Sequence, residues 1–433
     1  MTTLETPKAG AERVRRPIGR TRVIGYTMVG LGLFITLVFG AGSAGNAHSI
    51  LTFTPVNISS NAPWSIGALT VLTRYWNIGL GLIAIALGAE VVIRRPARAV
   101  MARFGVTAVL FFLAVVLWAS RTPGPSQVPT INVTSILIGS SAMVMVLIYG
   151  ALSGVMCERS GVVNIAIEGQ FIAGAFFGSM IASTTNNFIL AAVAGAGAGA
   201  LLGAILAFLS LRYLSDQIIV GVVLVTMLGS LSSYLNLQVL TPYPNLNTGN
   251  LAGNIAIPLL CKIPVIGPVF FNQTAFFYLM IILVALISFA LFKTRWGLRV
   301  RAVGEHPKAA ESVGINVIRT RYINVILGGA IAGVGGVAFM ASQGSFAVGY
   351  TSGLGYVALA ALIFGQWRPS GAVTAAVLFG TSVYLAYNLQ TYQIPIPTEI
   401  LEMFPYIITI AVVAGLIGRV RPPAADGRPY KRD

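Results

Sequence analysis

The run TAFFYLMIILVALISFALF, residues 274–292, contains no charged side chain. As a helix it is long enough to cross a hydrocarbon core about 30 Å thick. The chain becomes basic directly after this run, from Lys293 to Arg321. The pattern predicts a transmembrane helix, and similar apolar runs recur from Val23 to Gly418.

The composition agrees with a membrane protein. Hydrophobic residues make up 56% of the chain and charged residues 9%, whereas about 25% of the residues in a soluble domain are charged. We therefore expect an all-α polytopic membrane protein with about twelve transmembrane helices. The expected crossings are residues 23–45, 69–93, 104–119, 131–153, 161–182, 188–210, 217–239, 274–292, 322–342, 353–367, 371–389 and 404–418.

The formal net charge of +16 would suggest a nucleic acid partner if the protein were soluble. Here all but three of the 28 Lys and Arg residues lie in the tails and in alternate loops between the expected crossings; the three are Arg74, Arg121 and Lys262. This asymmetry indicates a cytoplasmic face that holds both termini. No nucleic acid partner is expected.

Residues 353–367 are short for a crossing, and a re-entrant loop is an alternative. A re-entrant loop would reverse every later segment and place Arg368 and the basic residues from Arg419 to Arg432 outside. We therefore interpret these residues as a short crossing. Residues 1–22 and 421–433 are expected to be basic cytoplasmic tails, solvated and partly disordered.

Small residues recur four apart on two of the expected helices. At this spacing they share one helix face and let two backbones approach closely. Packing within the bundle and a subunit interface are both compatible with such faces. They are Gly195, Gly199 and Gly203; Gly329 and Gly333; and Gly328, Ala332 and Gly336.

Several classes of function lack their sequence signals. There is no G-x-x-x-x-G-K-[ST] phosphate loop, so ATP hydrolysis by this chain is not expected. No Cys/His cluster has metal-ligand spacing, so neither a metal site nor a catalytic site is predicted. Glu90 and Glu168 are the fair candidates for carboxylates at membrane depth, which keeps an ion-coupled secondary carrier as an alternative.

The basic segment from Lys293 to Arg321 is predicted to contain a short helix. Pro307 suits the first helical position and Gly314 suits the position after the end. Between them Ala309, Ala310 and Val313 share a small apolar face. Two turns are not stable alone in water, so this helix must pack on its own bundle or on a partner.

The run WGLRVRAVGEHPKAAESVGINV, residues 296–317, resembles the signature cytoplasmic loop of ABC permeases for simple sugars and nucleosides. The resemblance implies a coupling helix that inserts into a groove of an ATPase subunit. The residues that it assigns to ATPase coupling are Gly304, Glu305, Pro307, Ala309, Ala310, Val313 and Gly314.

Three further segments resemble the same family in the same order, and the first is similar to the nucleoside branch. They are ERSGVVNIAIEG (158–169), DQIIVG (216–221) and GYVALAALIFGQWRP (355–369). The resemblance covers residues 123–420 and implies a type II-like importer permease core that includes the loop 293–321. The helices in residues 23–120 lie outside it.

The resemblance also implies partners and a location. The chain would be a permease subunit in a prokaryotic plasma membrane, paired with a second permease subunit that is either a relative or another copy. A cytoplasmic ATPase would use ATP and Mg²⁺, and an extracytoplasmic lipoprotein would capture a small polar solute. The expected solute is a nucleoside, purine or pyrimidine, and a ribose-like sugar is the alternative.

Two groups of residues are candidates for the substrate path. Asn164 and Glu168 are spaced i, i+4 and are expected on one helix face; Glu168 either binds a hydroxylated solute or anchors a neighbouring helix at its N-terminus. The other group combines amide or hydroxyl groups with aromatic rings, which either bind a nucleobase or only pack. It contains Gln343, Ser345, Phe346, Tyr356, Gln366 and Trp367.

Overall fold

The computed structural model describes residues 20–54, 67–94, 100–123, 130–249, 251–391, 399, 403 and 421–431. Within these residues, eight helices are long and apolar enough to cross a membrane, and Arg103–Ala119 and Leu354–Phe364 are shorter apolar helices. The predicted all-α, multi-pass architecture is confirmed. The expected crossing at residues 404–418 and most of the N-terminal tail lie outside the described residues.

The chain divides into two compact units, and the first consists of Met1–His48 and Leu72–Gly124. Its helices are α1 (Arg20–Phe34), continued by a π-helix (Ile35–Ala41), α2 (Thr73–Arg94) and α3 (Val100–Ala119). Short strands follow α1 and α3. In them Ala47 of β1 (Ala47–Thr52) lies opposite Pro123 of β3 (Thr122–Pro123). The expected crossing at 69–93 begins too early, because Leu69–Leu72 forms strand β2.

Glycines determine how α1 packs against α2. A Cβ at Gly32 would lie 2.8 Å from the carbonyl oxygen of Gly81, and a Cβ at Gly25 would lie 3.0 Å from that of Gly88. Both pairs recur at an interval of seven residues, so the contact repeats along the two helices. A larger side chain at these positions would force the helices apart.

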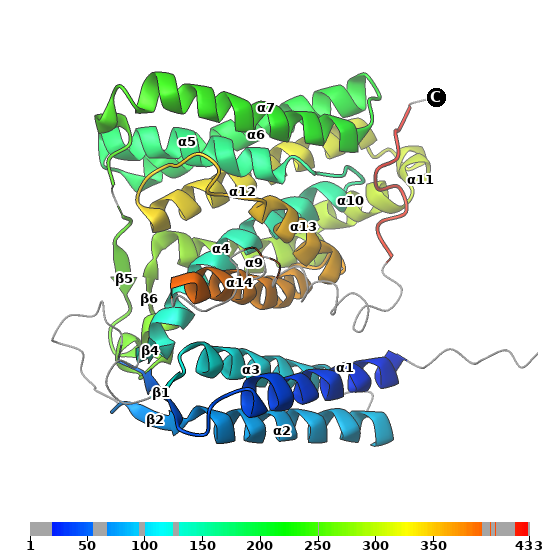
Figure 1. Ribbon diagram of the computed structural model, residues 1–433. Coiled ribbons are helices and arrows are strands. Elements are labelled where there is room, and N and C mark those ends of the chain that lie inside the picture. Colours follow the sequence, from blue (N-terminus) through cyan, green and yellow to red (C-terminus); the bar gives the residue numbers. More distant parts are fainter. Residues whose placement is uncertain are drawn as a thin grey trace, which may run out of the picture. The chain divides into compact units, whose positions relative to one another are not determined.

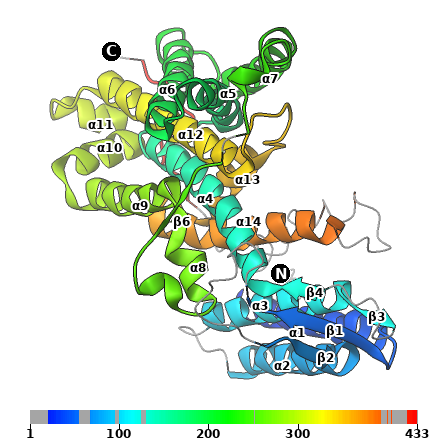
Figure 2. The same cartoon turned by 90° about the vertical axis from the view of Figure 1, so that its left-hand side faces the viewer.

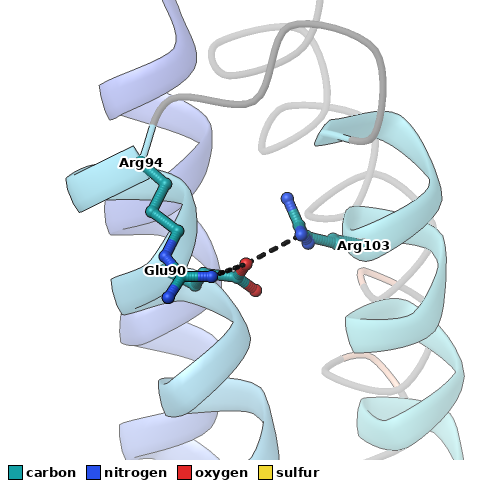
Figure 3. Close-up of polar contacts among 3 residues, drawn as sticks. All are labelled: Glu90, Arg94 and Arg103. Atoms are coloured by element: carbon teal, nitrogen blue, oxygen red, sulfur yellow. Dashed lines mark hydrogen bonds and ion pairs between the residues drawn. The ribbon is translucent and has the colours of Figure 1, made fainter.

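An ion pair joins α2 to α3 (Figure 3). Arg103 Nη2 lies 2.8 Å from Glu90 Oε1, and Arg94 Nη1 lies 3.5 Å from the same oxygen. Glu90 is therefore a structural partner of two arginines. This pairing leaves Glu168 as the stronger of the two carboxylates considered for ion coupling.

The second unit consists of Ser49–Val71 and Pro125–Asp433. Its helices are α4 (Val133–Glu158), α5 (Ile167–Thr185), α6 (Phe188–Arg212), α7 (Gln217–Leu235), α8 (Ile266–Phe270), α9 (Ala275–Lys293), α10 (Arg295–Glu305), α11 (Pro307–Ser312), α12 (Val317–Gln343), α13 (Leu354–Phe364) and α14 (Pro369–Thr391). Strand β4 (Thr130–Asn132) runs parallel to residues 50–52 of β1, and β5 (Asn254–Ala256) pairs antiparallel with β6 (Asn272–Thr274).

Helices α4 and α12 form the centre of this unit. In the apolar stretches of α4 and α12, 72% and 67% of the residues are buried. In those of α6, α7 and α9 the buried share is 28–33%. Figure 2 shows α12 between α6 and α4. Gly329 and Gly333 of α12 meet Gly199 and Gly195 of α6 at backbone contact, while Gly336 faces α5. The glycine faces therefore pack within the bundle.

Figure 1 shows α10 and α11 at one end of these helices and β5 and β6 at the other. We name them the loop end and the strand end. Helix α13 has 11 residues, about 16 Å, which is half the thickness of a hydrocarbon core. Irregular backbone at residues 344–353 precedes it. The chain thus returns from the strand end to the loop end partly as loop and partly as helix. The short crossing at 353–367 stays a prediction.

Candidate functional site

Helix α13 begins inside the second unit, beside the first turn of α5. The Glu168 side chain, 5% exposed, accepts hydrogen bonds from the backbone N–H groups of Gly353, at 3.0 Å, and Gly355, at 2.6 Å. The first turn of a helix has free N–H groups and favours negative charge. Glu168 therefore caps α13, which supports its interpretation as an anchor for a neighbouring helix.

Asn164 does not share a helix face with Glu168, and that prediction was wrong. Residues 161–166 are irregular, since α5 begins only at Ile167. The fully buried Asn164 amide donates to Ser153 Oγ at 3.1 Å and to Gln170 Oε1 at 3.1 Å. Gly161, at φ +88°, reverses the chain after α4 and removes Asn164 from the helical register.

An aromatic cluster lies between α12 and α13. Phe346, 4% exposed, makes edge contacts with Phe176 at 5.4 Å and with Tyr350 at 5.7 Å between ring centroids. Tyr350 stacks on Phe339 at 4.7 Å. The side chain of Asn247 holds the Phe346 backbone from both sides, accepting from its N–H at 2.8 Å and donating to its carbonyl at 2.9 Å.

Gln366 and Trp367 lie at the opposite end of α13, near the end of α4. Arg159 Nε donates to the carbonyl oxygen of Trp367 at 2.8 Å, and the Trp367 indole N–H donates to Glu158. Trp367 is 5% exposed, whereas the Gln366 side chain is exposed. These contacts fix the turn that follows α13 to the end of α4.

The predicted substrate-path residues thus fall in separate places along the unit. Gln343 is exposed at the end of α12 and Ser345 is half-buried beside the aromatic cluster. Tyr356, 44% exposed, lies one residue after Gly355 in the first turn of α13. The structure brings Phe346 to an aromatic cluster and Glu168 to the start of α13, but it does not gather the set into one pocket.

The loop between α9 and α12 contains two helices instead of the predicted one. Amphipathic α10 precedes α11, which starts at Pro307 as predicted. Gly314 follows α11 with φ +85°, and a Cβ added there would meet nothing within 4 Å, so its role is conformational, as predicted. Gly304 packs on the carbonyl oxygen of Arg159, and Glu305 Oε2 accepts from the backbone N–H of Ala424 at 3.2 Å.

The predicted apolar face of α11 is not a single exposed surface. Ala309 and Val313 are exposed, Val313 by 75%, but Ala310 is 3% exposed. Ala310 packs with Val303, Val317 and Tyr430 in a small apolar cluster. The expectation that all three residues are available to a partner was wrong for Ala310, because the short helix rests on its own chain through that residue.

Burial shifts the pKa values of two ionisable side chains at the loop end, Arg159 and Asp426. Burial lowers the pKa of the Arg159 guanidinium, while Glu305 favours its charged form. Burial also raises the pKa of Asp426 to about 7, against opposing effects of Glu158 and Arg321. Asp426 belongs to the C-terminal segment 421–431, which lies beside α11 (Figure 1) and was expected to be solvated.

Three positioning residues escaped the sequence reasoning. Arg159 and Gln170 lie in or beside the segment 158–169, which was singled out for Asn164 and Glu168 alone. Asn247 lies in a long loop rich in Pro and Asn, where nothing distinguishes it from its neighbours. Its partner, Phe346, is 99 residues away along the chain.

Residues 136–413 match the family described as branched-chain amino acid transport system / permease component. The chain belongs to this permease family. The match starts after the helices of the first unit and includes α10–α13. No solved structure matches this permease.

Curated relatives match about two thirds of the permease. The nucleoside ABC transporter permease protein NupC of Lactococcus lactis subsp. cremoris is 40% identical over 296 residues, which cover 66% of this chain and 92% of the relative. The guanosine ABC transporter permease protein NupQ of Bacillus subtilis is 39% identical over 299 residues, with 66% and 92% covered. The putative glucose ABC transporter permease protein TsgC13 of Haloferax volcanii is 31% identical over 317 residues, with 66% and 94% covered.

Proposed function

We propose that this permease forms the transmembrane path of an ATP-driven importer for nucleosides. The observation that carries the proposal is the likeness to NupC and NupQ, which are named for nucleosides and guanosine and are 40% and 39% identical. Each match covers 66% of this chain and 92% of the relative. The solute is a nucleoside, purine or pyrimidine.

The aromatic cluster supports a solute with a planar ring. Phe339 and Phe346 contact Tyr350, and Phe176 packs on Phe346. The buried Tyr350 hydroxyl has no hydrogen-bond partner among the described residues. A nucleobase offers a face for stacking and an edge for hydrogen bonds. Movement of the irregular segment 344–353 would expose these groups to a passing solute.

The partners belong to the same proposal. A cytoplasmic ATPase docks on the exposed side of α11 through Ala309 and Val313, and it binds and hydrolyses ATP with Mg²⁺. A second permease subunit, a related chain or another copy, completes the path, and an extracytoplasmic lipoprotein delivers the solute. The loop end and both termini are cytoplasmic, as the distribution of Lys and Arg indicates.

Transport requires alternation between two states of the helices. ATP binding moves α10 and α11, and the breaks at residues 159–166 and 344–353 let α5 and α13 change their angles without bending a continuous helix. Two states of similar energy suffice, since ATP binding shifts their populations. Glu168 keeps the starts of α5 and α13 together in both states.

Uptake by the assembled complex in liposomes tests the proposal. Radiolabelled uridine and guanosine are offered with ATP inside, and unlabelled nucleosides, ribose, galactose and glucose compete. Competition by nucleosides alone supports the proposal. Competition by sugars alone would favour the alternative that TsgC13 suggests, and uptake by the lone chain under an ion gradient would favour a secondary carrier that uses Glu168.

Val313→Arg tests the docking surface on α11. We expect it to lower assembly with the ATPase at least about tenfold, because a charged side chain would enter an apolar contact. Tyr213→Arg, at an exposed position after α6, is the matched control. Equal effects of the two variants would mean that the ATPase docks elsewhere.

A further inference from the structure

The C-terminal segment 421–431 is packed into the loop end, contrary to its expected solvation. Ala425 is 6% exposed and Tyr430 is 7% exposed. The segment forms a turn at residues 424–427, where Gly427 has φ +72°. A basic segment that buries an alanine and a tyrosine has a defined position.

One side of the segment holds α10 and α11. The Ala425 N–H donates to the carbonyl oxygen of Gly304 at 2.9 Å, and the Tyr430 hydroxyl donates to Glu311 of α11. The Tyr430 ring also packs against Val303 and Ala310. Both helices of the loop are therefore attached to the segment.

The other side of the segment contacts the break between α4 and α5. Asp426 faces the carboxyl group of Glu158, the last residue of α4. A Cβ at Gly427 would lie 3.4 Å from Val163, and the Ala425 carbonyl oxygen lies beside Gly161. The segment thus joins the loop to the residues that precede α5.

Arg321 of α12 shows that the segment is part of the fold. Its side chain is 0% exposed, and it donates to the carbonyl oxygens of Arg428, at 3.1 Å, and Ala425, at 3.5 Å. A buried guanidinium without acceptors is strongly destabilising. Both acceptors of these hydrogen bonds belong to the segment.

We propose that residues 421–431 act as a strut that moves with α10 and α11 as one body and transmits their displacement to the break at residues 159–166. Arg321, Asp426 and Tyr430 are positioning residues of this strut. The strut adds a second connection to the direct contact of Gly304 with Arg159. The strut's role in coupling rests on the proposed function. The physical connection that it makes between α10, α11 and residues 159–166, which we call its continuity, does not.

Hydrogen exchange of the purified permease tests the continuity. Tyr430→Ala is expected to speed exchange about tenfold or more in α11 and also in residues 159–166, because both depend on the same segment. Tyr430→Phe retains the ring and should restore most of the protection at 159–166. Arg421→Gln, at an exposed position of the segment, is the charge-changing control. Faster exchange confined to α11 would overturn the strut.

A disulfide tests whether the segment must stay attached. In Val163→Cys with Gly427→Cys, the Cβ at position 427 would lie 3.4 Å from the place of a Val163 γ-carbon, which brings the two thiols close enough to react. Because Gly427 has φ +72°, the substitution strains both redox forms alike, and the reduced form of the same variant is therefore its control. The strut predicts equal uptake per ATP hydrolysed in the oxidised and reduced complexes. Loss of uptake on oxidation alone would mean that the segment has to detach, which contradicts movement as one body.

Coupling is measured as solute imported per ATP hydrolysed by the assembled complex. Tyr430→Ala should lower this ratio several-fold while ATP hydrolysis continues, and Tyr430→Phe should recover it. An unchanged ratio in a complex that imports nucleosides would refute the strut's role and leave the proposed function intact. If the wild-type complex imports no nucleoside, the proposed function fails, and hydrogen exchange still decides the strut.

Discussion

Glu168 and Glu158 lie on either side of the break between α4 and α5, and their carboxyl groups are satisfied in different ways. Glu168 accepts from two backbone N–H groups at the start of α13. Glu158 accepts from the indole of Trp367 and faces Asp426 of the C-terminal segment. Backbone donors at a helix start cannot titrate or turn away, whereas side chains and a terminal segment can.

The comparison separates a rigid contact, at Glu168, from a contact that can rearrange, at Glu158. At Glu168, the first turns of α5 and α13 meet through backbone donors whose positions the α13 helix itself defines. At Glu158, the contacts come from the turn after α13, from the C-terminal segment and, through that segment, from the loop that holds α10 and α11. We therefore expect substitutions at the first place to affect folding and those at the second place to affect coupling and its pH dependence.

The largest effect is expected for Glu168→Ala. The variant leaves the N–H groups of Gly353 and Gly355 without an acceptor in the interior, which costs about 3 kcal/mol or more. The melting temperature of the purified permease should fall clearly, and less in Glu168→Gln, which retains one acceptor oxygen. Thr226→Ala, at an exposed hydroxyl on α7, is the control. An unchanged melting temperature would mean that α13 does not depend on this cap.

A smaller effect is expected for Trp367→Phe. It removes the N–H that Glu158 accepts but keeps an aromatic ring at this position, so we expect a loss of about 1–2 kcal/mol. Glu158 still faces Asp426, and the carbonyl oxygen of Trp367 still accepts from Arg159. A loss larger than that of Glu168→Ala, measured by the same melting experiment, would invert the comparison.

A third effect, on the docking of one segment and not on the stability of the whole fold, is expected from the titration of Asp426. Burial raises its pKa to about 7, so the docked segment binds a proton that the undocked segment has already released between about pH 4 and 7. The docking free energy should therefore be largest below pH 4 and decrease as pH rises to 7, by at most about 1.4 kcal/mol per pH unit. The groups that face Asp426 are Glu158 of α4 and Arg321 of α12.

Limited proteolysis of the C-terminal segment measures this dependence. Cleavage of the wild-type permease should be faster at pH 8 than at pH 5.5 once the protease's own pH dependence is corrected with a reference peptide. Asp426→Asn should remove most of the difference. A pH dependence that persists in this variant would assign the titration to another group.

Local properties of the sequence predicted much of the fold. The apolar run at 274–292 became α9, and Pro307 and Gly314 bound α11 as expected, because helix length, capping and left-handed backbone depend on adjacent residues. The close-packing glycine faces on α6 and α12 were also predicted from the sequence, since small residues four apart favour close packing with any neighbouring helix. Motif order, in turn, indicated the permease family.

The candidate site was predicted less completely. Asn164 was misplaced because α5 begins only at Ile167, after Gly161 and an irregular stretch. An i, i+4 spacing predicts a shared helix face only where both residues are helical. Ala310 fitted an apolar face, yet sequence spacing cannot tell whether such a face meets the chain's own core or a partner. The basic composition of residues 421–431 predicted solvation, and the buried Tyr430 contradicted it.

The sequence by itself determined that this protein is a helical membrane permease, because apolar length, charge placement and the order of motifs are properties of neighbouring residues. Only the tertiary structure decided how its buried polar groups are satisfied. Glu168 meets Gly353 across 185 residues of chain, and Arg321 meets Ala425 across 104. A buried charge requires a partner, but its own sequence neighbourhood does not specify which distant backbone group supplies it.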